Sequence, residues 1–274
     1  MTDAPPPEGP RRVREVPLEQ PPALVHPGWA DAFPWLIQGT TVRGTAEVPF
    51  DLGMFSSGSP ESVVLGHWTV LRRALGAECV IHAQQVHGAD VRVQGPSESG
   101  GGRGAGSWTR NDTSGLRLAE PCDGHATAQP GALLAVTVAD CVPVFLVDAR
   151  RRAVAMLHAG WRGAAAGVLE RGFAVMTEAF TSDPSDVHVH FGPAICGDCY
   201  EVGPEVFNAL DQPVPQAARP IDLRSVLARR ATDAGARADH VSVSEHCTRC
   251  TESGLFSHRA GDACRQVGYL AVRS

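Results

Sequence analysis

Strand-like and helix-like patterns of apolar residues alternate along most of the chain. Apolar, valine-rich segments predict buried strands, and they cover residues 79–93 (as two short strands), 132–148, 153–159 and 187–195. Residues 163–180 carry apolar side chains at helical spacing, and residues 222–236 start at a favourable N-cap, Asp222, so both segments predict helices. Because strands and helices are intermixed, the pattern predicts an α/β fold with mixed β-sheets.

Two segments lack these patterns. Residues 1–28 contain eight prolines and few residues that could build a core, which predicts a disordered tail. Residues 95–119 include five glycines between Gly100 and Gly106, which predicts a flexible surface insertion. The remainder, 29–274, is expected to form a single domain.

The charge pattern narrows the classes of partner. The net charge is −6, and all 24 cationic residues are arginines, so no basic surface indicates binding to nucleic acid or to anionic lipid. The absence of lysine excludes Schiff-base chemistry and a P-loop lysine. No apolar run reaches the length of about 18 residues that a membrane span needs.

The eight cysteines point to metal, catalytic or core roles. The N-terminal residues lack the apolar region of a signal peptide, so a cytoplasmic location is expected. In that reducing compartment cysteines seldom form disulfides.

One predicted hairpin brings a cysteine next to a histidine. If Ala149 and Arg150 form a two-residue loop, Cys141 lies directly opposite His158 on one face, at a Cβ separation of about 4.5–5.5 Å. That separation suits two ligands of one zinc ion. A catalytic zinc site takes three protein ligands, and His87, at a strand end before Gly88, is the best third candidate.

Four further cysteines form two C-x-x-C pairs, Cys196/Cys199 and Cys247/Cys250. Two such pairs can hold a structural zinc ion, although they lie farther apart in sequence than in a compact zinc ribbon. His188 and His190 share one face of a predicted strand, where they could form a ligand pair or pack in the core.

Several motifs occur in a fixed order along the chain. They are QxHGxDV at 85–91, DGxxT at 123–127, TxADCxPVxLxD at 137–148, HAGWRG at 158–163 and GPAIxxxCYEVGPEV at 192–206. Together they resemble the YfiH-like laccase-domain family, whose members are also called polyphenol oxidases and purine nucleoside phosphorylases. The resemblance extends over roughly residues 36–273.

The resemblance implies a layered α/β/β/α sandwich and a zinc ion held by His87, Cys141 and His158. It also implies phosphorolysis of adenosine, inosine, guanosine and methylthioadenosine, and deamination of adenosine. The partners would then be purine nucleosides and phosphate, while the oligomeric state stays open. Arg43 occupies the position of a family arginine near the site.

Phosphorolysis needs a phosphate site, and phosphate favours arginines and helix N-termini. Arg162, at the start of the predicted helix, and Arg43 are therefore the phosphate candidates. Arg162 could instead form an ion pair with Glu170 or Glu178. Zinc with an open coordination position could polarise substrate.

Two other polar residues could take part in the reaction. Asp140, next to Cys141, could act as a general acid or base, or could serve only as a structural hydrogen-bond acceptor. Gln85 could orient the substrate, because its amide both donates and accepts hydrogen bonds.

Three alternative functions remain. A copper-dependent polyphenol oxidase would use copper at the Cys/His site, which the Irving–Williams order permits, but one H-x-H and no H-C-H argue against a laccase mechanism. A metal-free cysteine hydrolase would use Cys141 as nucleophile and His158 or His87 as base. A zinc-stabilised interaction domain would rely on the two C-x-x-C pairs instead.

Overall fold

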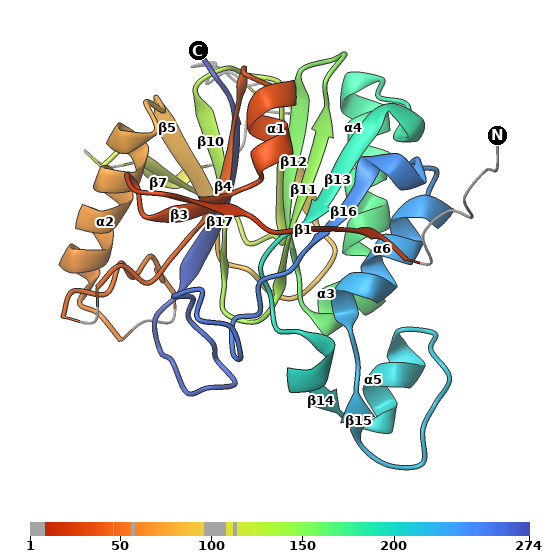
Figure 1. Ribbon diagram of the computed structural model, residues 1–274. Helices are drawn as coiled ribbons and strands as arrows, with labels where there is room; N and C mark the ends of the chain where they lie inside the picture. The colour runs from red at the N-terminus through yellow and green to blue at the C-terminus, as the bar shows by residue number, and fades with distance from the viewer. Residues whose placement is uncertain (1–8, 46, 56–57, 96–107, 112–113) are drawn as a thin grey trace.

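Two mixed β-sheets lie face to face, with helices against their outer faces (Figure 1). This arrangement is seen in a computed structural model that describes residues 9–45, 47–55, 58–95, 108–111 and 114–274. It confirms the predicted α/β/β/α sandwich.

One sheet contains seven strands among the described residues. Its order is β1 (Arg11–Val13), β16 (Val241–Ser244), β13 (Val187–Phe191), β11 (Val142–Asp148), β12 (Ala153–Ala159), β9 (Gly124–Thr127) and β6 (Val91–Val93). β11 runs antiparallel to both of its neighbours, β12 and β13, whereas β13 and β16 run parallel.

The other sheet contains eight strands within the part of the chain that the structure describes. Its order is β2 (Val16–Leu18), β3 (Ala23–Val25), β4 (Leu36–Thr41), β17 (Gln266–Val272), β10 (Ala132–Val138), β5 (Cys79–Ala83), β8 (Leu116–Ala119) and β7 (Trp108–Asn111). The centre of this sheet is also mixed, because β10 pairs antiparallel with β17 and parallel with β5.

The helices are α1 (Pro27–Ala32), α2 (Glu61–Ala74), α3 (Trp161–Ala165), α4 (Val168–Phe180), α5 (Pro204–Ala209) and α6 (Leu223–Asp233). Trp29 of α1, and Phe33 directly after it, pack in the core between the two sheets. α4 and α6 lie against the seven-stranded sheet and α2 against the eight-stranded sheet (Figure 1). Across the described residues, no helix combines the length and the apolar character needed to cross a membrane.

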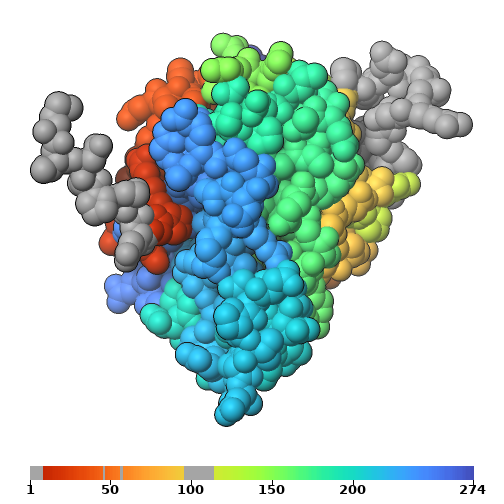
Figure 2. All heavy atoms as spheres, turned by 90° about the vertical axis from the view of Figure 1, so that its right-hand side faces the viewer, coloured from red at the N-terminus to blue at the C-terminus, as the bar shows by residue number. Residues whose placement is uncertain are grey.

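A small excursion protrudes from the lower end of the sandwich. It contains α5 and a short two-stranded ribbon, β14 (Glu201–Val202) and β15 (Arg219–Pro220). The space-filling view shows this segment, in cyan, as the tapered lower end of the molecule (Figure 2).

Alternate side chains of β11 and β12 face opposite layers. Phe145 and Met156 belong to the core between the sheets, whereas Leu146 and Leu157 belong to the core beneath the helices, together with Phe173 of α4. Every residue of both strands is buried. Burial on both faces explains why these strands are continuous apolar runs without polar alternation.

Two predicted elements prove to be divided. The apolar run 132–148 forms two strands in different sheets, β10 and β11, joined by a turn in which Asp140 has φ 86°. The predicted helix 163–180 forms α3 and α4, separated at Gly167, which has φ 86°. A left-handed residue interrupts a right-handed helix, and glycine adopts that conformation at low cost.

The two segments predicted to be disordered or flexible are partly ordered. The prediction of a disordered tail is wrong for residues 9–28, because β1 pairs with β16, β3 pairs with β4, and α1 begins at Pro27. Residues 1–8 lie outside the described residues. Within 95–119, β8 pairs with β5, so this part belongs to the sheet. The glycine-rich residues 96–107 lie outside the described residues.

Candidate metal centre

Three side chains converge at the end of the sandwich where α3 begins, which is the lower end in Figure 1. The ligand atoms of His87, Cys141 and His158 all lie within 4.8 Å of one another. Cys141 directly precedes β11, His158 is near the end of β12, and His87 lies in the loop between β5 and β6. The structure therefore brings together the three residues predicted to hold a metal ion.

The hairpin that carries two of them differs in register from the prediction. His158 pairs with Pro143, and four residues, not two, connect β11 to β12. Cys141 is therefore a diagonal neighbour of His158 on the adjacent strand. The predicted register placed the two residues directly opposite each other. The difference is two residues, and side chains alternate with a period of two, so Cys141 and His158 remain on the same face.

Asp123, which is fully buried, holds the two histidines in place. Its Oδ1 accepts a hydrogen bond from His158 Nδ1 at 3.0 Å and one from the His87 backbone N–H at 2.9 Å. Because a carboxylate only accepts, Nδ1 carries the proton and Nε2 of His158 is left as the ligand atom. A carboxylate that accepts the remaining ring N–H of a metal-binding histidine is typical of protein metal sites.

The loop around His87 wraps the same carboxylate. Asp123 Oδ2 accepts from the backbone N–H groups of Gly88 at 2.7 Å and Val86 at 3.3 Å. The N–H groups of three successive residues thus surround the Asp123 carboxylate. His87 adopts φ 60°, and the backbone curves around the carboxylate at this residue. Such concave backbone turns are anion sites, and here the anion is part of the chain.

Gly160 leaves the space that the ligand atoms require. A Cβ at this position would lie 3.0 Å from Cys141 Sγ and 3.2 Å from His87 Cδ2. The donor set of one thiolate and two imidazoles suits zinc, and three protein ligands leave one position open for a substrate. The residues present therefore fit a catalytic metal ion.

Cys141 and His158 form a charged pair when no metal is bound. Burial opposes ionisation of the thiol, but the charge of His158 and hydrogen bonds from His158 and His87 lower the pKa of Cys141 to about 6. Burial likewise opposes the imidazolium, yet the thiolate and the Asp123 carboxylate raise the pKa of His158 to about 9. In metal-free protein the Cys141 side chain is therefore mainly a thiolate at neutral pH.

In metal-free protein, alkylation of Cys141 by iodoacetamide is expected to have a midpoint near pH 6, because only the thiolate reacts. A lowered pKa means that the thiolate persists from alkaline to neutral solution, and that reactivity falls only as the pH drops through about 6. Peptide mass spectrometry after timed labelling measures this rate for each cysteine.

Cys264 is the internal control for this measurement. Burial raises the pKa of its thiol, so its alkylation is expected to require more alkaline solution. A Cys141 midpoint at the ordinary cysteine value, about 8.5, would contradict the charged pair.

A cavity of about 340 Å³ adjoins the three residues. Its lining includes His87, Cys141 and His158, together with Gln85, His258 and Arg265. The volume falls in the range of small-molecule sites, about 300–1,000 Å³. The candidate metal centre therefore faces a space that can admit a small substrate.

The two polar residues predicted to assist the reaction have structural partners. The Gln85 amide donates to the Thr137 carbonyl at 2.7 Å and accepts from the Thr137 backbone N–H at 2.9 Å. Both carboxylate oxygens of Asp140 also accept hydrogen bonds, from the Thr248 hydroxyl and from the backbone N–H of Arg259. Gln85 still lines the cavity, whereas Asp140 supports the C-terminal loop; their catalytic roles stay predictions.

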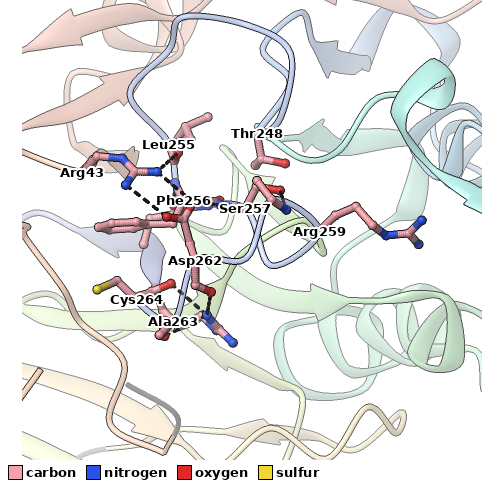
Figure 3. A network of polar contacts seen from close by, with 12 residues as sticks. Arg43, Thr248, Leu255, Phe256, Ser257, Arg259, Asp262, Ala263 and Cys264 are labelled. Carbon is pink, nitrogen blue, oxygen red and sulfur yellow. Dashed lines mark hydrogen bonds and ion pairs between the residues drawn. The ribbon is translucent and has the colours of Figure 1, made fainter. Parts of the chain in front are cut away.

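The two arginines predicted to bind phosphate lie outside the cavity lining, as far as the described residues show. Arg43 donates to both oxygens of Asp262, at 3.1 and 2.8 Å, and to the Leu255 carbonyl at 3.1 Å (Figure 3). It also lies 4.6 Å from the centre of the Phe256 ring. Arg43 thus fixes the loop that carries His258.

Arg162 lies on α3, which has only five residues. Its side chain is exposed and stacks on Trp161, 4.4 Å from the ring centre. Among the described residues Arg162 forms no ion pair with Glu170 or Glu178. Glu178 pairs with Arg171 instead. A role for Arg162 in phosphate binding stays a prediction.

Three functional candidates were missed from the sequence alone. Asp123 lies in the DGxxT motif, which could have drawn attention to it, but its partners are distant in sequence. His258 and Arg265 enter the cavity from the C-terminal loop, and no spacing signal connects them to the metal ligands.

Comparison with known proteins identifies the family of the chain. Residues 38–273 match the family model described as multi-copper polyphenol oxidoreductase laccase. The chain belongs to this family. Purine nucleoside phosphorylase YlmD of Geobacillus stearothermophilus is 31% identical over 90% of this chain and 95% of its own length. Adenosine deaminase RL5, from an unknown prokaryotic organism, is 36% identical over 51% of this chain and 57% of its own.

A solved structure shares the fold. The crystal structure of YlmD from Geobacillus stearothermophilus superposes with a TM-score of 0.78 at 28% identity, covering 92% of this chain and 96% of that one. The chain is thus a family member whose curated relatives carry enzyme names. Its three convergent residues form a candidate metal site.

Proposed function

We propose that this protein is a zinc-dependent purine nucleoside phosphorylase that converts a nucleoside and phosphate to a free base and a sugar 1-phosphate. Adenosine, inosine, guanosine and methylthioadenosine are the proposed substrates, and deamination of adenosine is a second proposed activity. The strongest support is the triad of His87, Cys141 and His158 beside a cavity of substrate size. The names of the relatives supply the substrate class.

The chain's own residues have separable tasks in this proposal. His87, Cys141 and His158 would hold the zinc ion, which supplies Lewis-acid chemistry when bound. Asp123 keeps the proton on Nδ1 of His158 and so leaves Nε2 as the ligand atom. Gln85, held by its hydrogen bond to Thr137, would present a fixed polar side chain to the substrate at the cavity wall.

The phosphate site is the second requirement. Arg265 and His258 line the cavity and can contact an anion there. Arginine is well suited to phosphate because its planar fork donates two parallel hydrogen bonds. We therefore assign phosphate binding to Arg265 and His258 in preference to Arg43 and Arg162.

Incubation of zinc-loaded protein with adenosine, with and without phosphate, tests the proposed activity. Chromatography separates adenine, inosine and hypoxanthine. Phosphorolysis releases adenine only when phosphate is present, whereas deamination forms inosine in either case. The absence of phosphate-dependent base release would refute the phosphorylase proposal.

Replacing Arg265 with alanine is expected to raise the KM for phosphate about 10–100-fold, because a charge-assisted hydrogen bond contributes about 1.5–3 kcal/mol. The KM for the nucleoside should change much less. Arg265 also donates to backbone carbonyls of its own loop, including that of Cys264 at 2.8 Å. Arg265→Lys, which keeps the positive charge, should therefore retain more phosphate affinity than Arg265→Ala.

Arg162→Ala is the matched control, because Arg162 is exposed and lies outside the cavity lining. Steady-state kinetics with phosphate as the varied substrate compares the variants. A large increase in the KM for phosphate in Arg162→Ala, with none in Arg265→Ala, would reverse the assignment.

A metal-free cysteine hydrolase is the alternative that one observation favours, namely the thiolate of Cys141 beside His158. Metal analysis of protein purified without added metal separates the two. Zinc that is present in the wild type and lost in Cys141→Ser supports the metalloenzyme. Protein without zinc or copper, inactivated by alkylation of Cys141, would support the hydrolase.

A further inference from the structure

Four cysteines that are distant in sequence meet on the seven-stranded sheet side of the molecule. The sulfur atoms of Cys196, Cys199, Cys247 and Cys250 all lie within 4.8 Å of one another. One pair follows β13 and the other follows β16, and these strands are parallel neighbours. The carboxyl ends of parallel neighbours meet at the same edge of a sheet, which brings the two C-x-x-C loops together.

The sulfur of Cys247 lies in an environment built for a thiolate. It accepts hydrogen bonds from the backbone N–H groups of Cys196 at 3.2 Å, Arg249 at 3.3 Å and Cys250 at 3.5 Å. Cys247 is also buried, with 1% of its surface exposed. Three donors directed at one buried sulfur favour its charged form, which is the form that binds metals.

The spacing of the sulfurs fits one tetrahedral ion. Cys196 Sγ and Cys250 Sγ are 3.7 Å apart. A tetrahedral zinc ion with Zn–S bonds of about 2.3 Å separates its sulfurs by roughly 3.8 Å. A disulfide bond would need about 2.05 Å, and all four cysteines are free thiols.

We propose that Cys196, Cys199, Cys247 and Cys250 bind a second zinc ion, in a structural site separate from the His87–Cys141–His158 centre. Four thiolates in tetrahedral arrangement complete the coordination of zinc and leave no position for a substrate. The site therefore stabilises the fold around it and takes no direct part in the reaction. This inference does not depend on the proposed phosphorylase activity.

The second site supports two segments at the lower end of the sandwich. Cys199 is followed by the excursion that contains α5 (Figures 1 and 2). Between Cys247 and Cys250 lies Thr248, whose hydroxyl donates to Asp140, the residue before Cys141. Loss of the second zinc ion is therefore expected to loosen the excursion and the turn that holds Cys141.

Metal analysis of the purified protein tests this proposal. Wild-type protein should contain two zinc ions per chain, and the double variant Cys196→Ser/Cys250→Ser should contain one. This variant removes one ligand from each pair at positions that are not fully buried. Cys264→Ser, a part-buried cysteine outside both clusters, is the matched control and should retain two.

Cobalt substitution in the Cys141→Ser variant isolates the second site. Four thiolates should give an intense near-ultraviolet thiolate-to-cobalt charge-transfer band and the visible bands of a tetrahedral ion. Adding Cys196→Ser/Cys250→Ser to Cys141→Ser should abolish both. These measurements remain decisive even if the double variant folds poorly, because the Cys141→Ser spectrum is recorded with all four cysteines present.

Two outcomes would overturn the proposal. One is wild-type protein with a single zinc ion and no tetrahedral cobalt spectrum in Cys141→Ser. The other is disulfide bonds among the four cysteines in protein isolated without oxidant. Because zinc content and spectra are independent of turnover, failure of the phosphorylase assay would leave this result unaffected.

Discussion

Replacing Cys141 with serine is expected to abolish tight zinc binding at the centre formed with His87 and His158, and to lower phosphorolytic kcat/KM by at least about 100-fold. A serine hydroxyl stays protonated at neutral pH and is a poor zinc ligand, since ligands must be deprotonated. Lewis-acid assistance contributes several kcal/mol, and each 1.36 kcal/mol corresponds to about tenfold in rate. Zinc analysis and steady-state kinetics measure the two effects.

Cys264→Ser is the control for this prediction as well, because Cys264 belongs to neither cysteine cluster. It should keep both zinc binding and activity near those of the wild type. A Cys141→Ser protein that keeps full activity would exclude both the metal centre and the cysteine hydrolase. Loss of activity without any change in zinc content would favour the hydrolase.

Replacing Asp123 with asparagine is expected to weaken zinc binding at this centre about 10–100-fold, the usual effect of removing a group that orients a metal-bound histidine. Asparagine has nearly the same shape, but its NH₂ group cannot accept hydrogen bonds. At least one of the donors from His158, His87 or Gly88 then loses its acceptor. An unsatisfied buried donor costs about 1–3 kcal/mol, so the free energy of unfolding should decrease by this amount.

Competition with a chromophoric chelator measures the zinc affinity, and urea unfolding measures the stability. Asp148→Asn is the matched control, because Asp148 is also a buried carboxylate and accepts backbone N–H bonds from Arg150 and Arg151. It lies at the opposite end of the β11–β12 hairpin. Asp148→Asn should leave the zinc affinity unchanged, and its amide oxygen can still accept both backbone bonds, which reach a single oxygen of Asp148. Equal losses of affinity in both variants would mean that Asp123 has no specific role at the metal centre.

Elements with clear boundaries were predicted well. The strand 153–159 is confirmed as β12, and the helix that follows Asp222 is confirmed as α6, with Asp222 accepting hydrogen bonds from Arg224 and Ser225. A capping side chain and a closing glycine are local signals. The division of 132–148 was missed because an apolar run buried on both faces has no period that marks its end.

The tail was misjudged for a different reason. Prolines disfavour regular structure locally, yet β1 needs only three residues to pair with β16 at the sheet edge. Glu15 then contributes its carboxylate to buried His190 at 2.9 Å. Neither partner can be inferred from residues 1–28 by themselves.

The chemistry of the metal centre was largely present in the sequence. Cys141 and His158, on adjacent strands, and His87, before a glycine, are of residue types that can bind a metal ion. The structure brings the three together. Even the wrong hairpin register preserved this result, because a shift of two residues keeps side chains on the same face. The two C-x-x-C pairs were also visible, although their separation in sequence argued against a common site.

The sequence by itself predicted the α/β class and the three residues of the candidate centre, since periodicity, caps and ligand types are local properties of the chain. Only the tertiary structure decided which distant groups complete each site. It placed Asp123 against both histidines, put Arg265 in the cavity and left Arg162 outside it. It also joined the four cysteines through the parallel pairing of β13 and β16. Such contacts depend on strand order and on sheet packing, which no single segment encodes.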